Sequence, residues 1–205
     1  QAARLESRLG SSAEWPRLAD LRRVVQRLVD LVLDDDTTLL GLTAVKALRN
    51  PTSGALLPTH GVNVAVLSLV LAREVGLGRA AMVDVGLAAL AHDAGPDSIA
   101  DPMQRALRGA RFLLQLAPIA GVVRPVLAAV EQHAHEEAPG RLVAPESRDL
   151  TTRIVQIARA YDALTAHGGR EGRPDRVLAL LLAEEGGRLD RTLLKLFAHA
   201  MGIYP

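Results

Sequence analysis

Apolar residues recur at spacings of three and four along almost the whole chain, and this pattern constrains the fold more than any other feature. An early example is the series Leu18, Leu21, Val25, Leu28 and Val32. Such spacing gathers apolar side chains on one face of an α-helix, whereas the alternation of apolar and polar residues typical of half-buried strands is scarce. The sequence therefore predicts an all-α protein.

Glycine and proline interrupt this pattern and divide it into eight or nine helices. The interruptions include Asn50-Pro51, Gly76 with Gly78, and Gly186-Gly187. The fold class that we expect is a helical bundle. Its helices are predicted near residues 15–34, 37–49, 58–75, 79–93, 101–116, 122–137, 147–166, 174–185 and 189–201, with each end placed to within a few residues.

The composition bounds the size of the core and the kind of partner. A chain of 205 residues with 49% hydrophobic content can bury one substantial core, so one main domain is the simpler reading. The 24 basic and 23 acidic side chains nearly cancel, which gives no basic surface for a nucleic-acid polymer. The longest apolar run, residues 64–72, is too short to cross a bilayer, so we expect no membrane insertion.

The ends and the cysteine count carry weaker expectations. The chain contains no cysteine, which excludes disulfides and thiolate zinc sites and is compatible with the cytoplasmic location that we expect. It begins with Gln1 and not with methionine, from which we expect a further domain upstream. We assign residues 1–36 to an N-terminal helical segment that links to or contacts that domain, and residues 37–205 to the main domain.

Two histidine-bearing segments point to a metal site. His60 opens one predicted helix, and the dipeptide His92-Asp93 closes another. A divalent metal site in a helical protein needs imidazole and carboxylate side chains from separate helices, because no single helix presents a full coordination sphere. A lone helical histidine is more often structural, but these segments together favour a shared cleft formed by helix ends.

The remaining histidines are weaker candidates. His133 and His135 are two residues apart, so within one helix their side chains diverge by roughly 200° and only one can point inward. His167 and His199 stand near predicted helix ends, where we expect solvated side chains.

Three segments of the chain resemble, in the correct order, those of the HD-GYP domain, a branch of the HD phosphohydrolase superfamily. The resemblance covers roughly residues 37 to 205 and implies an HD-domain-like helical bundle. The segments are HGVNVAVLSLVLAREVGLGRAAMVDVGLAALAHDAG, RIVQIARAYDALTAHGGREGRP and LLKLFAHAMGIYP.

The resemblance also implies a chemistry. Members of the family hydrolyse cyclic di-GMP at a di- or tri-metal centre, iron or manganese for example, where a bridging water attacks the phosphodiester. His60, His92 and Asp93 stand at the positions of the family's first histidine and its His-Asp pair. His133 and His135 stand where the family has adjacent histidines, so these five residues form the implied ligand set.

The departures from the family pattern are more informative than the match. Pro96 replaces the lysine of the family's His-Asp-x-Gly-Lys, and Arg105 stands where another ligand histidine is expected. The Asp-Gly-x-Gly-Tyr-Pro loop after the paired histidines is absent, and residues 52–59 contain no acid. Arg159 replaces the last metal-binding carboxylate. The implied metal centre is therefore degenerate, with Asp93 as a vestige of the catalytic site.

Three functions remain open on the sequence alone. We prefer a pseudoenzyme that works in signalling without a metal cofactor, by contacting other signalling proteins or an upstream domain of the same chain, or by sensing a cyclic dinucleotide. The second alternative is an active phosphohydrolase with iron or manganese at an altered site. The third is a structural module that forms a homodimer through the helix near residues 14–34.

Arg159 decides between these alternatives. An arginine stays protonated in proteins and cannot ligate a metal. Asp162, one helical turn later, is the only nearby substitute that we consider as a ligand. Without metals the carboxylate of Asp93 would lose its positive partners, so we expect Arg159 to form an ion pair with Asp93 in a metal-free cleft.

Overall fold

The computed structural model describes residues 18–34, 59–92, 122–134, 147–167, 173–183 and 188–203, together with six helical positions between 104 and 114. Within these ranges there are seven helices and no strand. In chain order they are α2 (Leu18–Asp34), α4 (Thr59–Glu74), α5 (Arg79–Ala91), α7 (Val123–Ala134), α8 (Leu150–His167), α9 (Pro174–Ala183) and α10 (Arg191–Ala200).

The all-α class predicted from the sequence is confirmed. The number of eight or nine helices stays a prediction, because the helix expected near 37–49 lies outside the described residues and the one near 101–116 is described at only six positions. The domain boundary between residues 36 and 37 also lies outside the described residues. None of the described helices is long and apolar enough to span a membrane.

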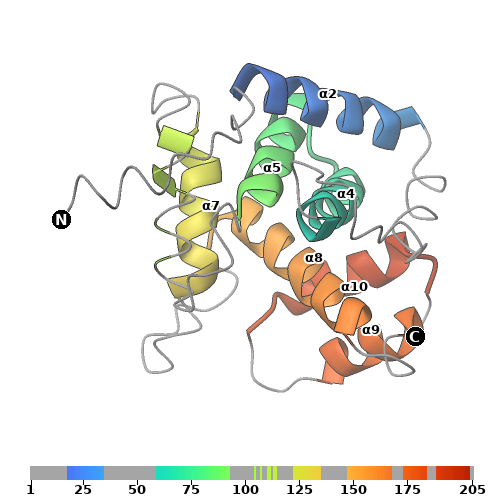
Figure 1. Cartoon of the computed structure of the whole chain (residues 1–205). Helices are drawn as coiled ribbons and strands as arrows, with labels where there is room; N and C mark the ends of the chain where they lie inside the picture. Colours follow the sequence, from blue (N-terminus) through green and yellow to red (C-terminus); the bar gives the residue numbers. More distant parts are fainter. Residues whose placement is uncertain are drawn as a thin grey trace, which may run out of the picture.

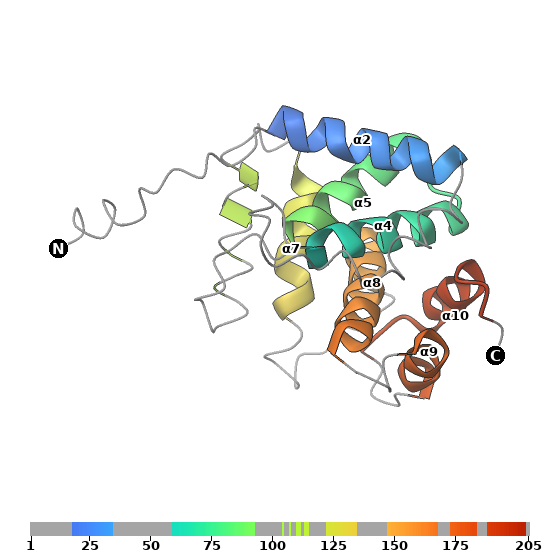
Figure 2. The same ribbon diagram turned by 45° about the vertical axis from the view of Figure 1, so that its right-hand side comes forward.

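The helices α4 and α5 form the centre of the molecule. Every residue of α4 from Val64 to Ala72 is buried, and α5 is buried almost continuously from Met82 to Ala91. A helix that is apolar on all sides must be covered on all sides. Figures 1 and 2 show this cover, with α2 lying across one side of the α4 and α5 pair and α8 on the opposite side.

A tight turn joins the two central helices. At the end of α4 the chain passes through Gly76, whose φ of 82° lies in the left-handed region that favours glycine. Its amide donates to the carbonyl oxygen of Arg73 at 2.8 Å, and the amide of Leu77 donates to that of Ala72 at 3.0 Å. These two bonds make a Schellman motif, which ends α4 and sends α5 back alongside it.

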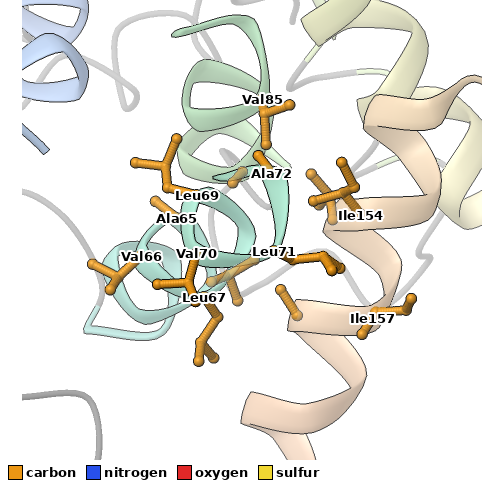
Figure 3. Packing of buried hydrophobic residues seen from close by; sticks show 14 of the residues in the cluster. Ala65, Val66, Leu67, Leu69, Val70, Leu71, Ala72, Val85, Ile154 and Ile157 are labelled. Atoms are coloured by element: carbon orange, nitrogen blue, oxygen red, sulfur yellow. The ribbon is translucent and has the colours of Figure 1, made fainter. Parts of the chain in front are cut away.

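The helix α8 crosses the central pair and shares its core. Ile154 and Ile157 of α8 are fully buried and lie beside Leu71 of α4 (Figure 3). Polar contacts fix the first turns of α8: Nη1 of Arg153 lies 2.8 Å from Oδ2 of Asp190, and Asp190 caps α10 by accepting from the amides of Thr192 and Leu193. The axial position of α8 is thereby set.

The contact between α2 and α5 depends on a glycine. A Cβ atom at Gly86 would lie 2.5 Å from Cγ1 of Val25, so the two helices approach more closely than a side chain would allow. Val25 is fully buried, and Leu21, Val29 and Val32 of α2 join the same core cluster. The helix α2 is thus packed into the core that α4, α5 and α8 form.

We expect Gly86→Ala to destabilise the protein although alanine favours helix. The added methyl group would displace a buried valine, which costs about 1–3 kcal/mol, against a gain in helix propensity of about 1 kcal/mol. Gly61→Ala is the matched control, because its Cβ would meet only the carbonyl oxygen of Leu90 at 3.7 Å. Denaturant unfolding measures both. A Gly86→Ala protein as stable as the Gly61→Ala protein would contradict the close packing.

The buried Tyr161 generates a second prediction. Its ring packs edge-on against Phe197, with ring centroids 5.2 Å apart. Burial, and then the negative charges of Asp162 and Asp175, raise the pKa of Tyr161 to about 12. The folded protein therefore favours the neutral phenol. The contribution of Tyr161 to the free energy of unfolding is complete below the unfolded pKa of about 10 and is lost as the pH rises toward 12.

We therefore expect the free energy of unfolding to fall by about 1–2 kcal/mol between pH 9 and pH 12 through this residue, allowing for water near the hydroxyl. Tyr161→Phe has no such proton to lose, so its stability should fall less over the same range. Urea unfolding of both proteins at several pH values gives the difference. Parallel pH profiles for the two proteins would show that Tyr161 titrates no differently after folding.

Candidate functional site

The two histidines expected at the start of α4 and the end of α5 lie together in the structure. His60 and His92 are each sixteen residues from Gly76, so the antiparallel hairpin of α4 and α5 places them at the same end. Their ring centroids are 5.2 Å apart, with an angle of 66° between the ring planes. The side chain of His60 is 33% exposed, whereas His92 is fully buried.

A carboxylate from α8 holds His60 in place. Nδ1 of His60 lies 2.5 Å from Oδ2 of Asp162, whose side chain is only 8% exposed. The second oxygen of the same carboxylate, Oδ1, accepts a hydrogen bond of 3.0 Å from Nδ2 of Asn63. Both oxygens of Asp162 thus face side chains of α4.

His92 is anchored by its own helix. Nδ1 of His92 lies 2.6 Å from the carbonyl oxygen of Ala89, three residues earlier in the last turn of α5. A carbonyl oxygen only accepts, so Nδ1 of His92 is the donor and carries the proton. Each of the two neighbouring rings therefore uses Nδ1 for a contact within the protein.

The other predicted ligands are only partly described. Asp93, Pro96, Arg105 and His135 lie outside the described residues, and the backbone of His133 belongs to α7 while its side chain is not described.

A contact of α7 bears on the position of His133. Two residues before it, Oε2 of Glu131 accepts from Oγ1 of Thr152 at 2.6 Å. Thr152 and Asp162 are ten residues apart on α8, which is about 15 Å along the helix axis.

Arg159 lies on α8, one turn before Asp162. Residues three apart share a face of a helix, so the arginine stands on the side of α8 that carries the carboxylate bound to His60. Its side chain is partly buried. A fixed positive charge thus lies on α8 one turn before the carboxylate that contacts His60. Whether it pairs with Asp93, as the sequence predicts, stays a prediction because Asp93 lies outside the described residues.

The described residues offer only part of a metal site. A histidine that donates Nδ1–H to a carboxylate or a carbonyl can ligate a metal through Nε2, and both His60 and His92 have this anchoring. The carboxylate of Asp162 is engaged with His60 and Asn63, and Arg159 cannot ligate. No group of three or more metal-binding side chains is present among the residues that the structure describes.

Sequence reasoning missed Asn63 and gave Asp162 a different role, as a substitute metal ligand. The signal for Asn63 is its spacing, because His60 and Asn63 are three residues apart and face the same neighbour. Of the two histidines expected to be solvated, His199 is 60% exposed and its Nδ1 lies 3.1 Å from Oε1 of Glu74. His167 ends α8, and its side chain is not described.

Comparison with known proteins gives one informative similarity. The chain is 27% identical over 221 aligned positions to a cyclic di-GMP phosphodiesterase (PA4108) of Pseudomonas aeruginosa, an alignment that covers 98% of this chain and 50% of the relative. The chain thus spans about half the length of the curated relative that it matches. No family model and no solved structure matches. The similarity supports an HD-GYP-like relationship over most of the chain.

Proposed function

We propose that this chain is a degenerate HD-GYP-like signalling module that does not hydrolyse cyclic di-GMP. The observation that carries the proposal is the arrangement of α8. Arg159 stands where the resemblance implies a metal-binding carboxylate, and the next carboxylate on the same face, Asp162, has both oxygens directed at His60 and Asn63. A phosphodiesterase of this kind needs metals to activate water and to neutralise developing charge.

The partners that we propose follow from the similarity and from the size of the match. The relative is named for cyclic di-GMP, which makes a cyclic dinucleotide the ligand to test first in the cleft. The relative is also about twice as long as this chain, so we propose that the module works with an upstream domain or with other signalling proteins in the cytoplasm. The sequence departures at Pro96 and Arg105 support the proposed absence of turnover.

Two alternatives have support from particular residues. The alternative of an altered metal site, with iron or manganese, in an active phosphohydrolase rests on the proximity of His60 and His92. Apolar side chains on the surface of α2 favour a dimerisation module, since Val24 and Leu31 are 43% and 51% exposed and lie seven residues apart on one face.

We expect the purified protein, supplied with Mn²⁺ or Fe²⁺, to release no hydrolysis product from cyclic di-GMP at an enzymatic rate. Turnover of about 1–10³ per second is typical of enzymes and would overturn the proposal. Arg159→Asp returns a carboxylate to α8 and should raise the metal content of the purified protein, measured by elemental analysis. Equal metal content in the two proteins would mean that Arg159 does not exclude the metal.

Melting temperature and sedimentation of the same purified protein distinguish the proposed modes of signalling. A ligand that binds the native state raises the melting temperature, by an amount that grows with the logarithm of its concentration relative to its Kd. A rise with cyclic di-GMP supports nucleotide sensing, whereas an unchanged melting temperature together with a dimer in sedimentation supports the dimerisation module. A monomeric protein whose melting temperature does not change with cyclic di-GMP supports the proposal that the module acts through contacts with other proteins.

We further propose that Arg159 replaces the lost metals by pairing with Asp93, the residue that follows His92. Arg159→Ala should then destabilise the fold by about 1–3 kcal/mol, because it leaves a carboxylate without its partner. Combining it with Asp93→Asn should recover much of that loss. The exposed Arg176 of α9 gives the matched control, Arg176→Ala, with an expected change within about 0.5 kcal/mol. A double-mutant cycle that shows no coupling between Arg159 and Asp93 would contradict the proposed ion pair.

A further inference from the structure

The contact between Asp162 and His60 fixes which ring nitrogen carries the proton. A carboxylate accepts hydrogen bonds through both oxygens. Oδ1 of Asp162 receives its hydrogen from the amide nitrogen of Asn63, and Oδ2 lies 2.5 Å from Nδ1 of His60. The hydrogen of this short contact therefore belongs to Nδ1 of His60, and in the neutral ring the lone pair is on Nε2.

The same contact fixes the orientation of the ring. Asp162 is buried on α8, so the Nδ1 edge of His60 is turned into the protein against that helix. One third of the His60 side chain is nevertheless exposed. Because the Nδ1 edge is already occupied by Asp162, Nε2 is the ring nitrogen of His60 that stays available for a ligand.

Asn63 supports this arrangement from the same helix. His60 and Asn63 are one turn apart on α4, and their nitrogen atoms meet the two oxygens of one carboxylate. The Asn63 contact prevents the carboxylate from rotating about its Cβ–Cγ bond, so Oδ2 stays opposite His60. Hydrogen bonds to a charged carboxylate are stronger than those between neutral groups, so this contact favours the ring tautomer that donates to it.

We infer that Asp162 and Asn63 are positioning residues, which hold His60 as the Nδ1–H tautomer and present Nε2 to whatever occupies the site. A neutral His60 then offers the site a hydrogen-bond acceptor, so its partner is a cation or a hydrogen-bond donor, and the anionic part of a ligand is met by other groups. This inference concerns the protein's own side chains and holds whether or not the module hydrolyses a phosphodiester.

Nitrogen-15 NMR of protein labelled on its histidine rings tests the inference directly. At a pH where the rings are neutral, protonated and unprotonated ring nitrogens have widely separated shifts, and His60→Gln identifies the His60 signals by their loss. We expect Nδ1 of His60 to be protonated in the wild type. Asp162→Ala should move His60 toward the Nε2–H tautomer that a free imidazole prefers in water, and Asn63→Ala should give a mixture of the two.

Two variants control for general disturbance. Thr165→Val alters α8 close to Asp162, because Oγ1 of Thr165 bonds to the carbonyl oxygens of Tyr161 and Asp162, but it leaves the carboxylate in place. Glu74→Gln removes the partner of His199 at an exposed site. Neither should change the His60 tautomer.

A wild-type spectrum with the proton of His60 on Nε2 would overturn the inference, and it requires no variant to fold. An unchanged tautomer in both Asp162→Ala and Asn63→Ala would overturn it as well. The hydrolysis assay is independent of these spectra, so the proposed function and this inference can fail separately.

Discussion

A buried carboxylate organises the candidate site. An isolated ionised carboxylate inside a protein is strongly disfavoured, and it persists there only with charged or hydrogen-bonding partners. Asp162 finds both of its partners, His60 and Asn63, on α4. The polar contact lies at the end of an interface that is otherwise apolar, where Ile154 and Ile157 pack against α4. The requirement to satisfy Asp162 thereby sets the rotation of α8 about its own axis relative to the start of α4.

The sequence predicts the parts of this arrangement that depend on local pattern. Apolar spacing locates the helices, and Gly76 marks the turn between two of them. Two residues at equal distances from a tight turn lie at the same end of the helix pair, which is why His60 and His92 meet. Asn63 and the role of Asp162 could not be predicted in the same way. Asn63 and Asp162 are ninety-nine residues apart in sequence, and their contact depends on how α4 and α8 are rotated against each other, which no local sequence pattern specifies.

The charges on α8 have a simple physical meaning. Arg159 and Asp162 occupy one face of the helix, one turn apart, so this face carries a carboxylate beside His60 and a cation one turn earlier. A metal centre needs several negative or neutral donors around a cation. Here the cation is covalently attached to the helix, and the carboxylate of Asp162 is bound to the protein's own imidazole. This face of α8 therefore carries one positive and one negative charge, one turn apart.

The packing of the core depends mainly on apolar residues. The buried stretches of α4 and α5 are covered by α2, α7, α8 and α10, and their hairpin is closed by backbone hydrogen bonds at Gly76. The cluster that these helices share consists of apolar side chains, to which the contacts of Asp162 with His60 and Asn63 add a polar link between α4 and α8. A change of charge at the partly buried position of Arg159 therefore alters the local electrostatics without opening the core, provided that each buried polar group keeps a partner.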